Sequence, residues 1–148
     1  MPSWEAVDAI RTFVGSDKLL SCASGNGLWE LFIQSRGVDV VATDTKPCST
    51  YHPVEEMDAI EAVKKYADHN CLMMSWPAYD DPMAYSCLKE FTGNKLVYIG
   101  EDEYGCTGDG AFHELLKEEW KKVDVVFIRQ FPGIHDALFF YTRKSKEE

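Results

Sequence analysis

Short apolar runs and amphipathic segments alternate along the whole chain. A helix is predicted near the N-terminus because Trp4, Val7 and Ile10 recur at helical spacing. Continuous apolar runs such as Cys71–Ser75 are typical of strands that are buried on both faces of a sheet. Elements that alternate in this way pack as a mostly parallel sheet covered by helices, an α/β fold. The length of 148 residues suits one such domain, spanning 1–148.

The remaining elements follow from the same patterns. Strands are predicted at residues 18–22, 38–43, 71–75, 95–100, 123–129 and 137–143, with a short strand near Val54. Helices are predicted at residues 3–14, 28–36, 56–67, 82–91 and 111–121. Because the last two strands are close in sequence, we expect them to pair as an antiparallel hairpin.

Charge and cysteine content narrow the classes of partner. The net charge of −10 would repel a polyanion at long range, so nucleic acid is disfavoured and a small-molecule or protein substrate is expected. The five cysteines form no C-x-x-C pair, so we expect neither a disulfide framework nor a metal site. Cys22, Cys71 and Cys87 lie in apolar runs and are predicted to be buried thiols. We find no membrane-length apolar run and no secretory leader, so a cytoplasmic protein without membrane partners is expected.

The most informative local pattern is a strand followed at once by a glycine turn and a helix start, at residues 19–28. Gly25 and Gly27 would let the backbone approach a ligand, and the helix N-terminus presents N–H groups to it. An ordinary strand-to-helix turn is the alternative. Asp44 ends the next strand, where a carboxylate can accept hydrogen bonds from two ribose hydroxyls, although a turn-starting aspartate would look the same. Together the turn and the carboxylate indicate a nucleoside site.

These residues make the chain resemble the class I methyltransferases, which use S-adenosyl-L-methionine (SAM). Those proteins carry an acidic-x-Gly-x-Gly-x-Gly motif after strand one, an acidic residue after strand two, and a seven-stranded sheet ending in an antiparallel hairpin. Here Ser21 stands where the acid usually stands, and Ala23 stands where the first glycine does. The resemblance implies a single three-layer Rossmann-like domain that binds SAM. It implies these cofactor-binding residues: Ser21, Ala23, Gly25, Asn26, Gly27, Asp44, Asp58, Ala59 and Ser75.

Asp58 and Ala59 belong to this set because residues 57–59 resemble the segment that meets the adenine ring. The alternative for Asp58 is an exposed residue in the first turn of a helix. The stretch between Asp44 and Asp58 is too short for the helix that usually lies there. The chain therefore resembles a trimmed version of the fold.

Candidate catalytic residues follow the predicted strands at 71–75 and 123–129. Residues 75–79 resemble the Asp/Asn-Pro-Pro-Tyr motif of amino-group methyltransferases, in which an aromatic ring stacks on the substrate. Trp76 and Tyr79 are therefore expected to contact the methyl acceptor, and a strand end packed by aromatic rings is the alternative. His135 next to Asp136 could act as an oriented general base, or could be an ordinary turn residue.

An acidic, glycine-rich loop at 101–110 follows the predicted strand at 95–100, at the same carboxyl edge of the sheet as the glycine turn. Its glycines would permit closure and its acids could meet a cationic substrate, whereas a solvated loop is the alternative. The first functional hypothesis is a SAM-dependent methyltransferase acting on a small molecule or a protein side chain. The second is a non-catalytic SAM-binding protein, a sensor or partner subunit. A nicotinamide dehydrogenase is disfavoured by the Ser-x-Ala-x-Gly-x-Gly spacing and by the terminal hairpin.

Overall fold

The structure is a computed structural model that describes residues 3–22, 24, 27–46, 51–75, 82–100, 110–128 and 137–144. The strands are β1 (Leu19–Cys22), β2 (Val40–Asp44), β3 (Glu55–Glu56), β4 (Cys71–Ser75), β5 (Lys95–Gly100), β6 (Trp120–Val126) and β7 (Ala137–Arg143). The helices are α1 (Trp4–Val14), α2 (Leu28–Ser35), α3 (Ala59–Lys65), α4 (Met83–Glu90) and α5 (Gly110–Glu119). The described strands form one sheet in the order β3-β2-β1-β4-β5-β7-β6.

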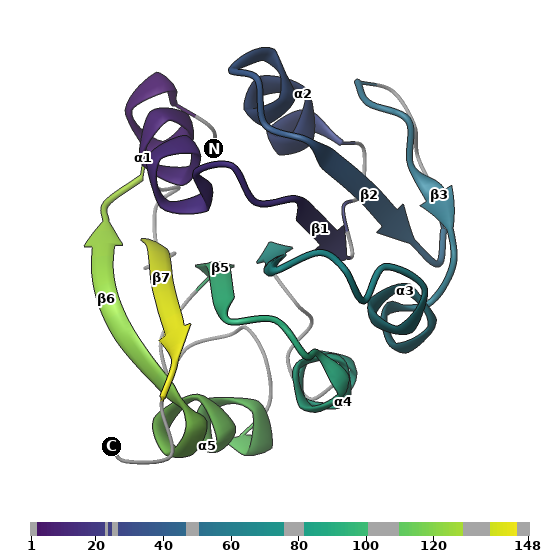
Figure 1. Cartoon of the computed structure of the whole chain (residues 1–148), viewed down its shortest axis with the longest axis vertical. Coiled ribbons are helices and arrows are strands. Elements are labelled where there is room, and N and C mark those ends of the chain that lie inside the picture. The colour runs from purple at the N-terminus through teal and green to yellow at the C-terminus, as the bar shows by residue number, and fades with distance from the viewer. Residues whose placement is uncertain are drawn as a thin grey trace, which may run out of the picture.

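Helices cover both faces of this sheet, so the molecule has three layers (Figure 1). Neighbouring residues of a strand point to opposite faces, and the two halves of the core follow this alternation. Leu19 and Met73 pack with α1 and α2 on one face. Leu20 and Leu72 pack with α3, α4 and α5 on the other. The predicted three-layer α/β architecture is confirmed.

The parallel strands end at one edge of the sheet. Strand β1 pairs in parallel with both β2 and β4, and the parallel pairing continues to β3 on one side and to β5 on the other. The chain therefore proceeds outward from β1 in one direction and from β4 in the other. Such a switch point opens a crevice outside the carboxyl ends of the two central strands, where open α/β sheets bind ligands.

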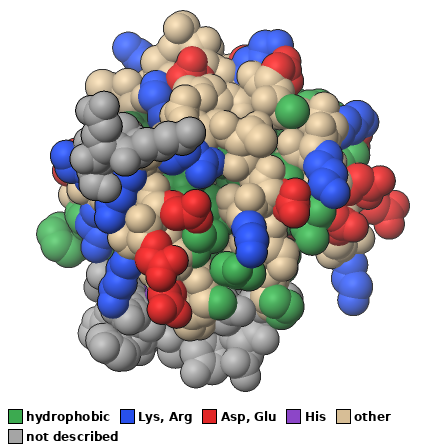
Figure 2. Space-filling view, turned by 60° about the horizontal axis from the view of Figure 1, so that its bottom comes forward, with side chains coloured by type: hydrophobic (Ala, Val, Ile, Leu, Met, Phe, Trp, Pro, Cys, Tyr) green, Lys and Arg blue, Asp and Glu red, His purple; other side chains and the backbone are tan. Residues whose placement is uncertain are grey.

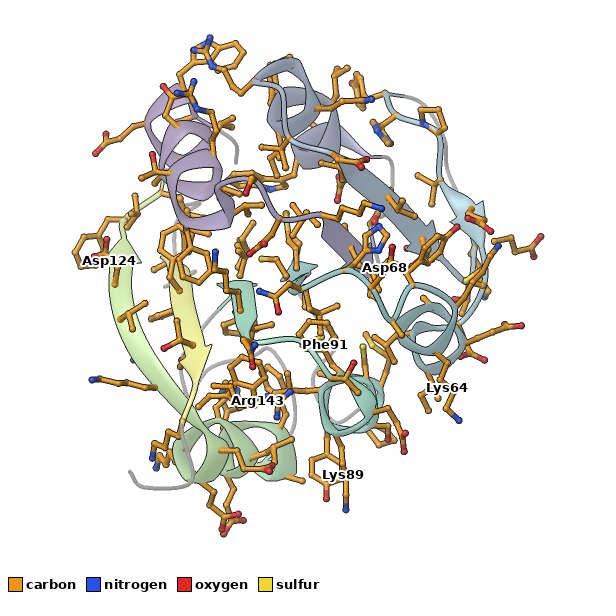
Figure 3. The ribbon with its side chains drawn as sticks, viewed as in Figure 1. Lys64, Asp68, Lys89, Phe91, Asp124 and Arg143 are labelled. Atoms are coloured by element: carbon orange, nitrogen blue, oxygen red, sulfur yellow. The ribbon has the colours of Figure 1, made fainter. Side chains whose placement is uncertain are left out.

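The antiparallel end of the sheet is confirmed, because β7 pairs antiparallel with both β5 and β6. The start of β6 differs from the prediction. Helix α5 ends at Glu119 and the strand begins at Trp120, not at residue 123. The Trp120 ring is buried, stacks on Phe91, and lies 4.5 Å below the Arg143 guanidinium. Arg143 also donates a hydrogen bond to the Phe91 carbonyl, and Figure 3 shows these two residues side by side. Tertiary packing thus outweighs the local pattern that predicts a helix to residue 121.

Other boundaries also shift, among them the end of β6, which lies at Val126 and not at residue 129. Helix α3 begins at Ala59 and not at residue 56, because residues 55–56 pair with the end of β2 as β3. This two-residue strand is the short one expected near Val54. Helix α4 begins at Met83, so Pro82 takes the N-cap position and not the first helical position. Strand β2 begins at Val40, two residues after the predicted start at residue 38.

The burial of the predicted thiols is confirmed, since Cys22, Cys71 and Cys87 are all free and buried. Within the described ranges, none of the helices has the length and hydropathy that a membrane span requires.

Candidate functional site

The candidate site lies at the switch point, where β1, β2 and β4 end together. Cys22 at the end of β1 pairs with Thr43 on one side and with Met74 on the other. The residue after each partner is a predicted site residue, Asp44 on β2 and Ser75 on β4. Strand register therefore brings these two side chains to the same edge as the turn that follows β1.

Gly27 closes that turn and starts α2 in a left-handed backbone conformation, with φ of +79°. Its N–H donates to the Ser24 carbonyl at 3.1 Å, and its own carbonyl accepts from Leu31 in the first turn of the helix. A Cβ atom at Gly27 would lie 2.8 Å from the Cβ of His52 and about 3 Å from the His52 backbone. The predicted need for glycine here is thus both conformational and steric.

A buried polar cluster lies directly beneath the turn. The Ser21 hydroxyl donates to Oε1 of Glu30 on α2 at 2.7 Å. The Ser24 hydroxyl lies 3.1 Å from both the hydroxyl and the carbonyl of Ser21, and Thr43 on β2 donates to the same carbonyl. Ser21 is fully buried and Glu30 is 1% exposed. These contacts connect the last residues of two neighbouring strands to the first turn of α2.

Glu30 is a buried acid at the candidate site that the sequence analysis did not predict. Burial raises the pKa of its carboxyl group, and the hydrogen bond from Ser21 acts in the opposite direction. Among the described residues, its Oε2 atom has no hydrogen-bond partner. Glu30 shares the inner face of α2 with Ile33, three residues on, so an acid at a position of core spacing was the available signal.

Asp44 has one carboxylate oxygen in a local hydrogen bond, because Oδ1 accepts from the Lys46 N–H at 2.9 Å. Its carbonyl accepts from the Met57 N–H at 3.1 Å. The second bond ties the predicted adenine segment, residues 57–59, to the end of β2. Asp44 and that segment are therefore neighbours, as the resemblance requires.

Within this segment, Asp58 caps α3, and its side chain accepts from the Glu61 N–H at 2.8 Å. The following Ala59 is buried against the core. Asp58 is thus an exposed residue at the start of a helix, close to the alternative interpretation, and a ligand role for it stays a prediction.

His52 is a second residue that the sequence did not indicate. The residue is 7% exposed, and Nδ1 lies 2.8 Å from the Pro53 carbonyl, so this nitrogen carries the proton and donates. Its backbone and Cβ press against Gly27, as described above. His52 therefore packs on the residue that closes the glycine turn.

The other predicted site residues lie outside the described residues and stay predictions. They are Ala23, Gly25, Asn26, Trp76, Tyr79 and His135, together with residues 101–109 of the acidic loop.

Comparison with known proteins identifies the fold. No protein-family model matches the chain, and no curated protein matches it in sequence. Several solved structures, by contrast, match nearly its whole length. A TehB-like SAM-dependent methyltransferase from Corynebacterium glutamicum is 15% identical, with a TM-score of 0.64 over 97% of this chain and 89% of that one. The chain has the Rossmann-like fold of class I methyltransferases.

Two further solved structures share this fold. One is the Burkholderia thailandensis 1,6-didemethyltoxoflavin-N1-methyltransferase, with S-adenosylhomocysteine bound; it is 13% identical, with a TM-score of 0.66 over 96% of this chain and 78% of that one. The other is a Streptococcus pneumoniae protein proposed to be a tRNA (m1A22) methyltransferase; it is 11% identical, with a TM-score of 0.66 over 97% of this chain and 71% of that one. At these identities the likeness is one of fold.

Proposed function

We propose that this chain binds SAM at the carboxyl ends of β1 and β2 and transfers its methyl group to a small molecule or a protein side chain. The observation that carries the proposal is the juxtaposition at the switch point. Gly27, Asp44 and Ser75 meet at one sheet edge in a fold whose solved examples include SAM-dependent methyltransferases. The sequence pattern predicts each of these positions as a ligand contact.

The residues present fit such a cofactor. Asp44, half-buried at the end of β2, would accept hydrogen bonds from the ribose hydroxyls. Residues 57–59, held against the end of β2, would flank the adenine ring. The turn from Ser24 to Gly27 would face the amino-acid part of the cofactor, above the unpartnered oxygen of Glu30. Bound SAM supplies an electrophilic methyl group on a sulfonium centre.

We place the methyl acceptor next to the ends of β4 and β5, since β4 adjoins β1 on the side away from β2 and β5 adjoins β4. Trp76 and Tyr79 follow β4, and the loop 101–110 follows β5. An aromatic wall suits a flat or cationic acceptor through stacking or cation–π contact. His135 would serve as a base if the acceptor must lose a proton. The role of these residues is to orient the acceptor in line with the methyl group.

A small-molecule or protein substrate stays our proposal. On the face drawn in Figure 2, Lys and Arg side chains lie among Asp and Glu side chains. The net charge of −10 opposes long-range attraction of a polyanion. Transfer of label from labelled SAM in cell extract distinguishes the two functions. A methyltransferase passes the label to an acceptor, whereas a sensor binds SAM without transfer.

We expect Asp44→Asn to weaken binding of S-adenosylhomocysteine roughly tenfold, about 1.4 kcal/mol, without loss of stability. The amide oxygen can still accept from the Lys46 N–H, so the local turn is kept. What is lost is the charge that strengthens the bonds to the ribose hydroxyls. Titration calorimetry of the variant and the unmodified protein measures the difference.

Asp124→Asn is the matched control. Asp124 is exposed on β6, at the opposite end of the sheet from β2, and Figure 3 shows it at the outer edge beside α1. This variant makes the same change of charge far from the proposed site. Equal affinities of the two variants for S-adenosylhomocysteine would show that Asp44 does not contact the ligand.

A further inference from the structure

Glu30 combines three features that a structural glutamate on a helix surface does not have. It is 1% exposed, it is held by a 2.7 Å hydrogen bond from Ser21, and its Oε2 atom is buried without a partner among the described residues. A buried acceptor without a donor carries the full cost of leaving water. Such a cost is expected where a ligand supplies the missing donor.

The position of Glu30 indicates which part of a ligand would do so. Its carboxylate reaches from α2 to Ser21, the penultimate residue of β1, directly under the turn that Gly27 closes. Ser21 is the position where the resembling proteins carry an acid, and a serine there brings no charge. A carboxyl group is thus brought to the end of β1 by Glu30, from the first turn of α2. The cluster reaches the sheet edge at Ser24, which is half-buried.

Resting on the proposed function, we infer that Glu30 is a specificity-determining residue that recognises the ammonium group of the ligand's amino-acid part. Ser21 orients the carboxylate through Oε1, and the ammonium group donates to Oε2. A cation is the favoured donor because a charge-assisted bond in a buried setting is stronger than a neutral one. The site would therefore distinguish nucleosides that carry an amino-acid chain from those that do not.

Proton release is a consequence of this pairing. In the free protein, burial favours the protonated carboxyl group and raises its pKa. Of the titratable groups in the described ranges, His52 faces the carboxylate from the segment packed on the turn, and its electrostatic interaction with Glu30 opposes the effect of burial on the pKa of that carboxyl group. The serine hydroxyls of the β1 end complete the surroundings. An arriving ammonium group favours the ionised form, so binding should release a proton and strengthen as pH rises.

The test compares two ligands on the full chain. S-adenosylhomocysteine carries the ammonium group, and 5′-methylthioadenosine has the same nucleoside but lacks the amino-acid chain. We expect Glu30→Gln to weaken S-adenosylhomocysteine binding at least roughly tenfold and to leave methylthioadenosine binding unchanged. Calorimetry in two buffers of different ionisation enthalpy should show proton release with S-adenosylhomocysteine for the unmodified protein and none for the variant.

Glu118→Gln provides the control, because it makes the same chemical change at an exposed position of α5. The inference is overturned if Glu30→Gln binds S-adenosylhomocysteine as the unmodified protein does, or loses both ligands equally. It is also overturned if proton release persists in the variant. If the unmodified protein binds neither ligand, the proposed function fails as well, so the two failures are distinguishable.

Discussion

Gly27→Ala is expected to lower the free energy of unfolding by about 2–4 kcal/mol. Two costs add at this position. A residue with a side chain is strained at φ of +79°, and the new methyl group would lie 2.8 Å from the Cβ of His52. The His52 backbone is equally close, so the neighbour cannot move aside by turning a side chain. Urea denaturation measures the loss.

Gly37→Ala separates the two costs. Gly37 also has a positive φ, of +89°, but a Cβ there meets nothing within 4 Å. This control should lose only the conformational part, about 1–2 kcal/mol. Similar losses for both variants would show that His52 does not pack on the turn. Because the clash would displace residues at the start of α2, Gly27→Ala should also lose ligand binding where Gly37→Ala keeps it.

Glu30→Gln is expected to stabilise the ligand-free protein by about 1–3 kcal/mol near neutral pH. The glutamine oxygen can still accept from the Ser21 hydroxyl, and the variant no longer buries an ionisable group. The sign follows from the raised pKa of Glu30. The folded state holds its proton more tightly than the unfolded state, so stability falls as pH rises from the ordinary glutamate pKa through the folded one.

The advantage of Glu30→Gln should therefore be small at about pH 4 and larger at about pH 8. Thermal and urea unfolding at both values measure it, with Glu118→Gln as the exposed control. A variant that is less stable than the unmodified protein at both values would mean that the carboxylate is a structural group, satisfied within the fold. A gain in stability together with a loss of ligand affinity is the combination expected of a binding residue.

The sequence was sufficient for the layers and for most of the strands. The run from Cys71 to Met74 is apolar throughout and lies between the polar residues Asn70 and Ser75, so the predicted limits of this strand coincide with those of β4. The start of β6 was not predictable in this way. Lys121 continues the polar helical pattern of α5. In the structure Trp120 stacks on Phe91 and residues 120–126 pair with β7, so Lys121 and Lys122 belong to an exposed edge strand.

The site was predictable where a backbone rule applies. Gly27 follows from the turn geometry, and Asp44 follows from its place at the end of a strand. Glu30 and His52 were not predicted, because a glutamate on a helix and a histidine in a loop are most often exposed. Glu30 is buried against Ser21, nine residues earlier in the chain, and His52 packs against Gly27, 25 residues earlier. A local sequence pattern does not record contacts of this kind.

The most direct test of the account is the thermal unfolding of the unmodified protein with SAM, S-adenosylhomocysteine or NAD. A ligand that binds the native state stabilises it by mass action, by about 2.7 kcal/mol at one hundred times its dissociation constant. We predict that SAM and S-adenosylhomocysteine raise the melting temperature of the protein and that NAD does not. An unchanged melting temperature with SAM at millimolar concentration, or a rise with NAD alone, would contradict it.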